Sequence, residues 1–218
     1  MSKTITEKMN NGREYRSFQV PFEIRAKEED GMIVEGYATT FNQPYTLADF
    51  GDYIVNEQVD RKAFDNTDMT DVIFQYDHEG RVFARNSNGT LSLSVDDKGL
   101  KVRADLGGTE IGRQLYQEIK GGYTNKMSFG FVVASDKVEE VTENDVTRVL
   151  RTITDVSKLY DVSAVSLPAN DSTVISARNF SNGVIEEIKA ERLKEQEARE
   201  QRKHKIKQLE LKIKLMEA

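Results

Sequence analysis

The stretch NKMSFGFVVA, residues 125–134, follows a pair of glycines and decides which kind of fold to expect. Its large apolar residues occupy every second position, and they are Met127, Phe129, Phe131 and Val133. An alternation of this period is typical of a β-strand that buries one face. Ser128 points to the opposite face of that strand. The stretch therefore predicts a strand and leaves open whether Ser128 is a nucleophile or an ordinary polar residue.

The same alternation recurs along most of the chain and predicts a mainly β (α+β) fold. Between these segments stand short runs of glycine, asparagine and aspartate, such as DDKG at 96–99 and TEND at 142–145, where we expect tight turns. One of the segments, residues 71–78, places Val72, Phe74, Tyr76 and His78 on one face. Strands are expected within residues 15–41, 71–78, 90–106, 137–153 and 158–167.

Helical spacing occurs once among these strands, in residues 109–122. Ile111, Leu115 and Ile119 form a stripe on one side, and Gly121 with Gly122 ends the helix. Many short strands with a single helix favour a barrel-like sheet and argue against a doubly wound α/β domain.

The composition changes sharply after the segment NFSNG, residues 179–183. From there proline and glycine disappear and charged residues dominate, with Ile206, Leu209, Ile213 and Met216 spaced as a short coiled-coil seam. We expect a flexible N-terminus at 1–14, a β domain at 15–180 and a charged helical tail at 184–218. For residues 189–203 the plainer interpretation is a solvated helix with no partner.

The composition excludes several classes of function. The net charge of −6 argues against a nucleic-acid partner, and the absence of cysteine excludes disulfides and thiolate metal sites. With only two histidines, neither a metal site nor a cofactor is expected. No apolar segment is long enough for a membrane span, and the N-terminal residues lack a secretory signal.

Three residues remain as candidates for chemistry, namely His78, Ser128 and Asp161. Serine hydrolysis needs a hydroxyl, a base and a group that orients the base. Each residue also has a plainer interpretation: His78 as a structural histidine at a strand end, Ser128 as a polar strand residue. Asp161 is unusual in an apolar strand and requires a partner, which could equally be a structural arginine or lysine.

A set of short motifs, in a fixed order, resembles the capsid-maturation (prohead) serine protease family of tailed bacteriophages, which is related to the herpesvirus assemblin proteases. The motifs are EGYATTFN (35–42), QYDHEG (75–80), a helix ending in GG, KMSFGF (126–131) and LYDVSAVSLPANDSTVISAR (159–178). The resemblance covers about residues 15–180. It implies a small β-barrel ringed by a few helices.

The resemblance also assigns roles to individual residues. His78 in YDHEG matches the catalytic histidine of the family, and Ser128 in MSFGF matches its nucleophile. Asp161 falls where the herpesvirus relatives place a histidine and the phage proteins an acid, more often Glu than Asp. The oxyanion hole would be formed by backbone N–H groups near Ala169 and Asn170. If Asp161 has no such role, Asp77 and Glu79 beside the histidine are the next carboxylates to consider.

The function implied is a serine endopeptidase that cleaves scaffold and capsid proteins, and also itself, during head maturation. Its partners would be the major capsid protein and the scaffold segment of that protein, inside the viral procapsid in the host cytoplasm. The tail would dock on scaffold helices, and a homo-oligomer stays an open alternative. A competing hypothesis is a non-catalytic scaffolding or capsid-interaction protein with the same fold.

Overall fold

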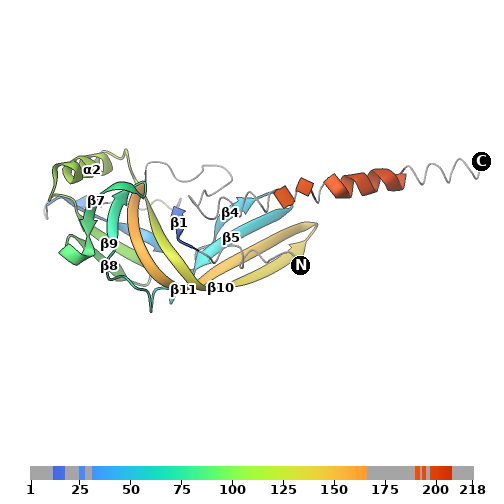
Figure 1. The fold of residues 1–218 in the computed structure, drawn as a ribbon, viewed down its shortest axis with the longest axis horizontal. Helices are drawn as coiled ribbons and strands as arrows, with labels where there is room; N and C mark the ends of the chain where they lie inside the picture. The colour runs from blue at the N-terminus through green and yellow to red at the C-terminus, as the bar shows by residue number, and fades with distance from the viewer. Residues whose placement is uncertain are drawn as a thin grey trace, which may run out of the picture.

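The computed structural model describes residues 12–17, 25–27, 31–165, 190–191, 193–194 and 197–207 (Figure 1). Strands dominate, so the expectation of a mainly β fold is confirmed. The elements are β1 (Glu14–Ser17), β2 (Arg25–Lys27), β3 (Ile33–Thr40), β4 (Tyr45–Asp49), β5 (Tyr53–Val59), β6 (Ile73–Tyr76), β7 (Glu79–Arg85), the 3-10 helix η1 (Asn86–Asn88), β8 (Leu91–Val95), β9 (Gly99–Asp105), α2 (Glu110–Lys120), β10 (Lys126–Glu143) and β11 (Val146–Val165).

The strands form two sheets that do not close into one barrel. The larger sheet has the order β1-β10-β11-β5-β4, with β6 pairing with β11 and with β7, and the smaller has the order β2-β3-β9-β8. Each sheet ends in edge strands, and no described ladder joins one sheet to the other. The described residues therefore do not form a closed barrel, and the expected small β-barrel is not confirmed. Within residues 31–165 the helices are α2 and η1 alone, so the described part of the domain is not ringed by helices.

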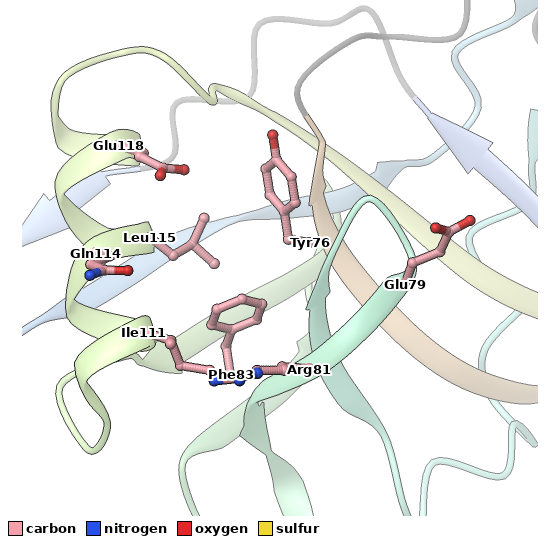
Figure 2. Close-up of a pocket in the computed structure, with 8 residues that line it drawn as sticks. All are labelled: Tyr76, Glu79, Arg81, Phe83, Ile111, Gln114, Leu115 and Glu118. Atoms are coloured by element: carbon pink, nitrogen blue, oxygen red, sulfur yellow. The ribbon is translucent and has the colours of Figure 1, made fainter.

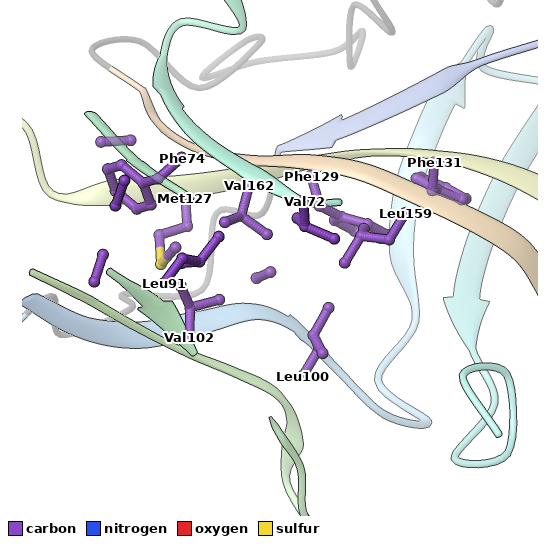
Figure 3. Packing of buried hydrophobic residues seen from close by; sticks show 14 of the residues in the cluster. Val72, Phe74, Leu91, Leu100, Val102, Met127, Phe129, Phe131, Leu159 and Val162 are labelled. Carbon is purple, nitrogen blue, oxygen red and sulfur yellow. The ribbon is translucent and has the colours of Figure 1, made fainter. Parts of the chain in front are cut away.

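Side chains from both sheets fill the space between them and form one core (Figure 3). Met127, Phe129, Phe131 and Val133 are all buried in this core, as the alternation predicts. The rings of Phe129 and Phe131 stack with centroids 4.3 Å apart. Ser128, on the other face of β10, is also fully buried, so both faces of the strand are covered there.

A long hairpin of β10 and β11 organises the larger sheet, and the two strands lie side by side in Figure 1. Its turn lies at Asn144 and Asp145, where φ is 50° and 62°, at the predicted TEND segment. Register shifts between Gly130 and Asp136 let the strands bend. The hairpin can therefore pair with β6 near one end and with β5 near the other.

Other predicted elements have the expected positions. β2 pairs antiparallel with β3, and β8 with β9, in the two predicted hairpins. Thr109 caps α2 by accepting a hydrogen bond from the backbone N–H of Gly112, and the helix ends at Gly121. The alternation predicts a strand over residues 71–78, but the observed strand is shorter. β6 ends at Tyr76, and His78 lies in the turn that follows.

The tail is helical where the structure describes it, at residues 190–191, 193–194 and 197–207. Ile206 is exposed, and Leu209, Ile213 and Met216 of the proposed seam lie outside the described residues. Among the described helices, none is both long and apolar enough to cross a bilayer.

Candidate active site

A two-residue turn between β6 and β7 positions His78. Asp77 and His78 both have positive φ, 49° and 60°, as the central pair of a type I′ hairpin turn requires. Neither residue is a glycine, so the turn holds a conformation that costs on the order of 1–3 kcal/mol for each such residue. The backbone N–H of Asp77 donates to the carbonyl oxygen of Ala164 at 2.9 Å, which fastens the turn to β11.

The hairpin of β10 and β11 positions the other two candidates. Ser128 on β10 stands opposite Ser163 on β11, and Asp161 lies two residues before Ser163 on the same face. β6 runs parallel to β11 over residues 161–164, which brings the turn after β6 to this face. Three distant segments therefore meet at one place.

The three predicted residues form a continuous chain of contacts. His78 Nδ1 lies 2.5 Å from Asp161 Oδ1, and His78 Nε2 lies 2.5 Å from Ser128 Oγ. A carboxylate can only accept, so the matching tautomer carries its hydrogen on Nδ1 and leaves Nε2 free to accept the serine proton. The imidazole can then act as a base toward Ser128, with Asp161 fixing its orientation.

Hydrogen bonds and neighbouring charges keep Asp161 ionised despite its burial. Burial alone would raise its pKa, but the hydrogen bond and charge of His78, the charge of Arg13 and the hydrogen bond from Ser163 together lower the pKa below its ordinary value of 3.8. The carboxylate is fully buried and makes an ion pair with Arg13. Both interpretations of Asp161 are therefore seen at once, since it contacts the histidine and a structural arginine.

Two contacts at this site have no counterpart in the sequence-based prediction. Ser163 Oγ donates to Asp161 Oδ1 at 3.0 Å and lies 3.2 Å from His78 Nδ1. The Oγ of Ser128 donates to the carbonyl oxygen of Arg16 in β1 at 2.8 Å. The position of Ser163 on the face of Asp161 was the available signal for the first contact, whereas no pattern in the sequence points to β1.

The remaining predicted site residues divide into two groups. Ala169 and Asn170, expected at the oxyanion hole, lie outside the described residues. Asp77 and Glu79, the fallback carboxylates, lie in and after the turn, while the carboxylate on His78 Nδ1 is that of Asp161.

A pocket of about 370 Å³ adjoins the turn on the side of α2 (Figure 2). Tyr76 and Glu79, which flank the turn, line it together with Phe83 and Leu115. Its lining mixes apolar rings and aliphatic chains with charged groups.

A second buried polar group lies beside the site, and we name it the ion-pair cluster. Arg16 Nε lies 2.5 Å from Glu57 Oε1, and Arg151 Nη1 lies 2.7 Å from Glu57 Oε2. Arg16 also pairs with Glu14, while Arg151 pairs with Asp136 at 2.6 Å. The members of the cluster are Glu14, Arg16, Glu57, Asp136 and Arg151, and Arg16 connects it to Ser128 through its backbone.

Comparison with known families gives one match. The model of a family described as caudovirus prohead serine protease matches residues 20–190 of the chain. Searches among curated proteins and among solved structures each found no match.

Proposed function

Because the chain belongs to the caudovirus prohead serine protease family, we propose that it is a serine endopeptidase of capsid maturation in which Ser128 is the nucleophile. His78 is the general base and acid, and Asp161 orients it. The match covers residues 20–190 and therefore includes all three residues.

The proposed reaction follows the contacts of the three side chains. His78 Nε2 takes the proton of Ser128 as its oxygen attacks a peptide carbonyl, and Asp161 stabilises the imidazolium that forms. The imidazolium then gives its proton to the departing amine, which leaves an acyl-enzyme. Water, deprotonated by the same nitrogen, releases the acyl group and restores the serine. Backbone N–H groups near Ala169 and Asn170 are proposed for the oxyanion, on the resemblance alone.

The single observation that carries this proposal is the contact chain itself. His78 is 83 positions from Asp161 and 50 positions from Ser128 in the sequence, and both of its ring nitrogens reach their partners at 2.5 Å. A non-catalytic scaffolding protein would have no need of a buried serine, imidazole and carboxylate in this order. That alternative predicts that the three residues can be exchanged without effect on processing.

The proposed substrates are the major capsid protein and its scaffold segment, cleaved inside the procapsid, together with the chain itself. We further propose that residues 15–180 form the protease domain and that the helical tail helps to carry the protease into the procapsid. Deletion of residues 184–218 should then lower incorporation into procapsids and leave the melting temperature of the domain close to that of the full chain.

Co-expression with the phage's own major capsid protein tests the proposed function. The full chain should shorten the capsid protein, and Ser128→Ala should leave it uncut, because the hydroxyl is the attacking group. Ser94→Ala is a matched control, since Ser94 is an exposed strand residue in the other sheet. Capsid processing by a folded Ser128→Ala protein would contradict the assignment.

A further inference from the structure

The candidate nucleophile is closed to solvent by the chain's own N-terminal strand. Ser128 and Asp161 are 0% exposed. β1 pairs antiparallel with β10 in the register Arg16 to Phe129 and Ser17 to Ser128. A peptide substrate cannot lie along this edge of β10 while β1 is paired there.

Contacts from β1 and the residue before it reach two of the three reacting groups. The Oγ of Ser128 has one proton, so a hydroxyl that donates to the Arg16 carbonyl does not donate to His78 Nε2. Arg13 pairs with the carboxylate of Asp161, and its guanidinium lies 4.3 Å above the ring of Tyr160. Both contacts bias the site away from proton transfer between serine and histidine.

Ser128 contacts the carbonyl group of Arg16 through a hydrogen bond to the carbonyl oxygen. A hydrogen bond to a carbonyl oxygen is favoured in the plane of the peptide, whereas a nucleophile approaches the carbonyl carbon from outside that plane. The Arg16 carbonyl therefore lies beside the nucleophile as a substrate carbonyl would, and its contact with Ser128 is a hydrogen bond at the oxygen.

The side chain of Arg16 anchors the strand in the ion-pair cluster. It is fully buried, with Nε 2.5 Å from Glu57 Oε1 and its guanidinium carbon 5.6 Å from the ring centre of Phe131. If β1 leaves, the cluster keeps the carboxylates of Glu57 and Asp136 and the single guanidinium of Arg151. The vacated pocket then holds two carboxylates and one guanidinium, so its net charge is −1 and Glu57 has lost the cation on Oε1.

We propose that β1 is an autoinhibitory strand in the substrate cleft, and that Glu57 at the base of that cleft selects a basic substrate side chain in the place of Arg16. This inference rests on the proposed protease function of Ser128. A substrate would add to the free edge of β10 as a strand, as β1 does, and bring the carbonyl of its basic residue to Ser128. Cleavage would then follow a lysine or arginine.

Labelling with a fluorophosphonate, which phosphonylates an activated serine with loss of fluoride, measures the opening of β1. Arg13→Ala and Arg16→Ala in the full chain should each speed the labelling of Ser128 by about 10-fold or more, because each loses a charge-assisted contact that holds β1 closed. Arg103→Ala, in the other sheet, should label at the wild-type rate. Thermal melts establish whether each variant is folded. If Arg16→Ala does not fold, the labelling rate of Arg13→Ala tests the proposal, because the Arg13 side chain is partly exposed.

The outcomes separate the two proposals. No adduct on Ser128 in any folded variant would contradict the protease assignment itself. Labelling of Ser128 at equal rates in wild type, Arg13→Ala and any folded Arg16→Ala would leave that assignment intact and overturn the autoinhibitory role of β1.

Fluorogenic peptides test the basic pocket. Three peptides differ only in the residue before the aminocoumarin, which is lysine, its uncharged analogue norleucine, or glutamate. We expect the lysine peptide to be hydrolysed with a kcat/KM about 10-fold or more above that of norleucine, since its cation meets the buried carboxylate of Glu57. Equal rates for lysine and norleucine, or no hydrolysis of any of the three by protein whose Ser128 reacts with the fluorophosphonate, would overturn the basic pocket.

Discussion

Two buried polar groups lie next to each other in this protein, and only one of them is arranged to move a proton. The proposed active site joins a neutral hydroxyl, an imidazole and a carboxylate. The ion-pair cluster joins arginines and carboxylates, and β1 contacts both groups. Burial of polar residues therefore does not identify the reactive site here, whereas an imidazole placed between a hydroxyl and a carboxylate does.

Charge locks the ion-pair cluster in one protonation state. Burial alone would raise the pKa of Glu57, but Arg16 and Arg151 lower it to about 2. Burial alone would lower the pKa of Arg16, but Glu57 and Glu14 raise it well above its ordinary value. Neither group can gain or lose a proton near neutral pH, so we assign the cluster to stability and to holding β1.

The largest expected effect on catalysis comes from His78→Ala. Removal of the base should lower the cleavage rate per folded molecule by about 10⁶-fold, as in other serine proteases. Stability should fall as well, because the His78 side chain is only 9% exposed and its removal takes a hydrogen bond from the buried carboxylate of Asp161. Cleavage of the capsid protein beside a urea unfolding curve measures both, and a rate within 10-fold of wild type would remove His78 from the site.

Asp161→Asn should have the next largest effect, about 10⁴-fold on the rate, because the amide can donate to Nδ1 and favour the wrong tautomer. Asp161→Ala should be less damaging than Asp161→Asn. Asp161→His should keep measurable activity, since a neutral imidazole at this position can also accept a hydrogen bond from Nδ1–H of His78. If Asp161 only pairs with Arg13, the residual activity of all three variants should follow the folded fraction.

Arg151→Met tests whether the ion-pair cluster contributes to stability rather than to catalysis. It leaves Glu57 and Glu14 with one cation fewer in a buried site, which should cost about 3–5 kcal/mol of the free energy of unfolding. The cleavage rate per folded molecule should not fall as it does in Asp161→Asn, because Arg151 contacts none of the three reacting groups and belongs to the cluster that holds β1 in place. A rate loss as large as that of Asp161→Asn, in folded protein, would show that the cluster takes part in catalysis.

The smallest expected effect is the acid dependence of stability. Glu57 has a pKa near 2 when folded and 4.5 ordinarily, so its contribution is present above about pH 4.5 and is lost as the pH falls toward 2. Asp161 acts in the same direction below its ordinary value of 3.8. Urea unfolding from pH 6 to pH 2 should therefore show a steeper loss for wild type than for Glu57→Gln. Parallel curves would contradict the role of Glu57.

Much of the fold follows from alternation and turn chemistry in the sequence. Met127 to Val133 are buried on one side, the hairpin turns at Asn144 and Asp145, and Thr109 begins the helix, all as predicted. The closed barrel does not follow, because strand alternation specifies which faces are buried and leaves open how the sheet edges pair.

Only part of the candidate site could be predicted from the sequence. The sequence predicts His78, Ser128 and Asp161 as site residues. Asp161 stands out because it lies in an apolar strand, and the order of the motifs points to all three. The position of His78 in a turn could not be predicted, since alternation continues through Asp77 without a glycine to mark the bend. The contacts of Arg13 and Arg16 could not be predicted, because a charged N-terminal segment is normally solvated. Here the buried carboxylates of Asp161 and Glu57 bind these two arginines.

The most direct test of the account is the site at which a fluorophosphonate modifies the full chain, read by intact mass and peptide mapping. A catalytic centre of Ser128, His78 and Asp161 should give a single adduct on Ser128 and no adduct in Ser128→Ala. Labelling in folded His78→Ala should be slower by orders of magnitude, because the hydroxyl needs the imidazole to lose its proton. An adduct on another serine, or equal labelling in His78→Ala, would contradict the claim that these three residues form the catalytic centre.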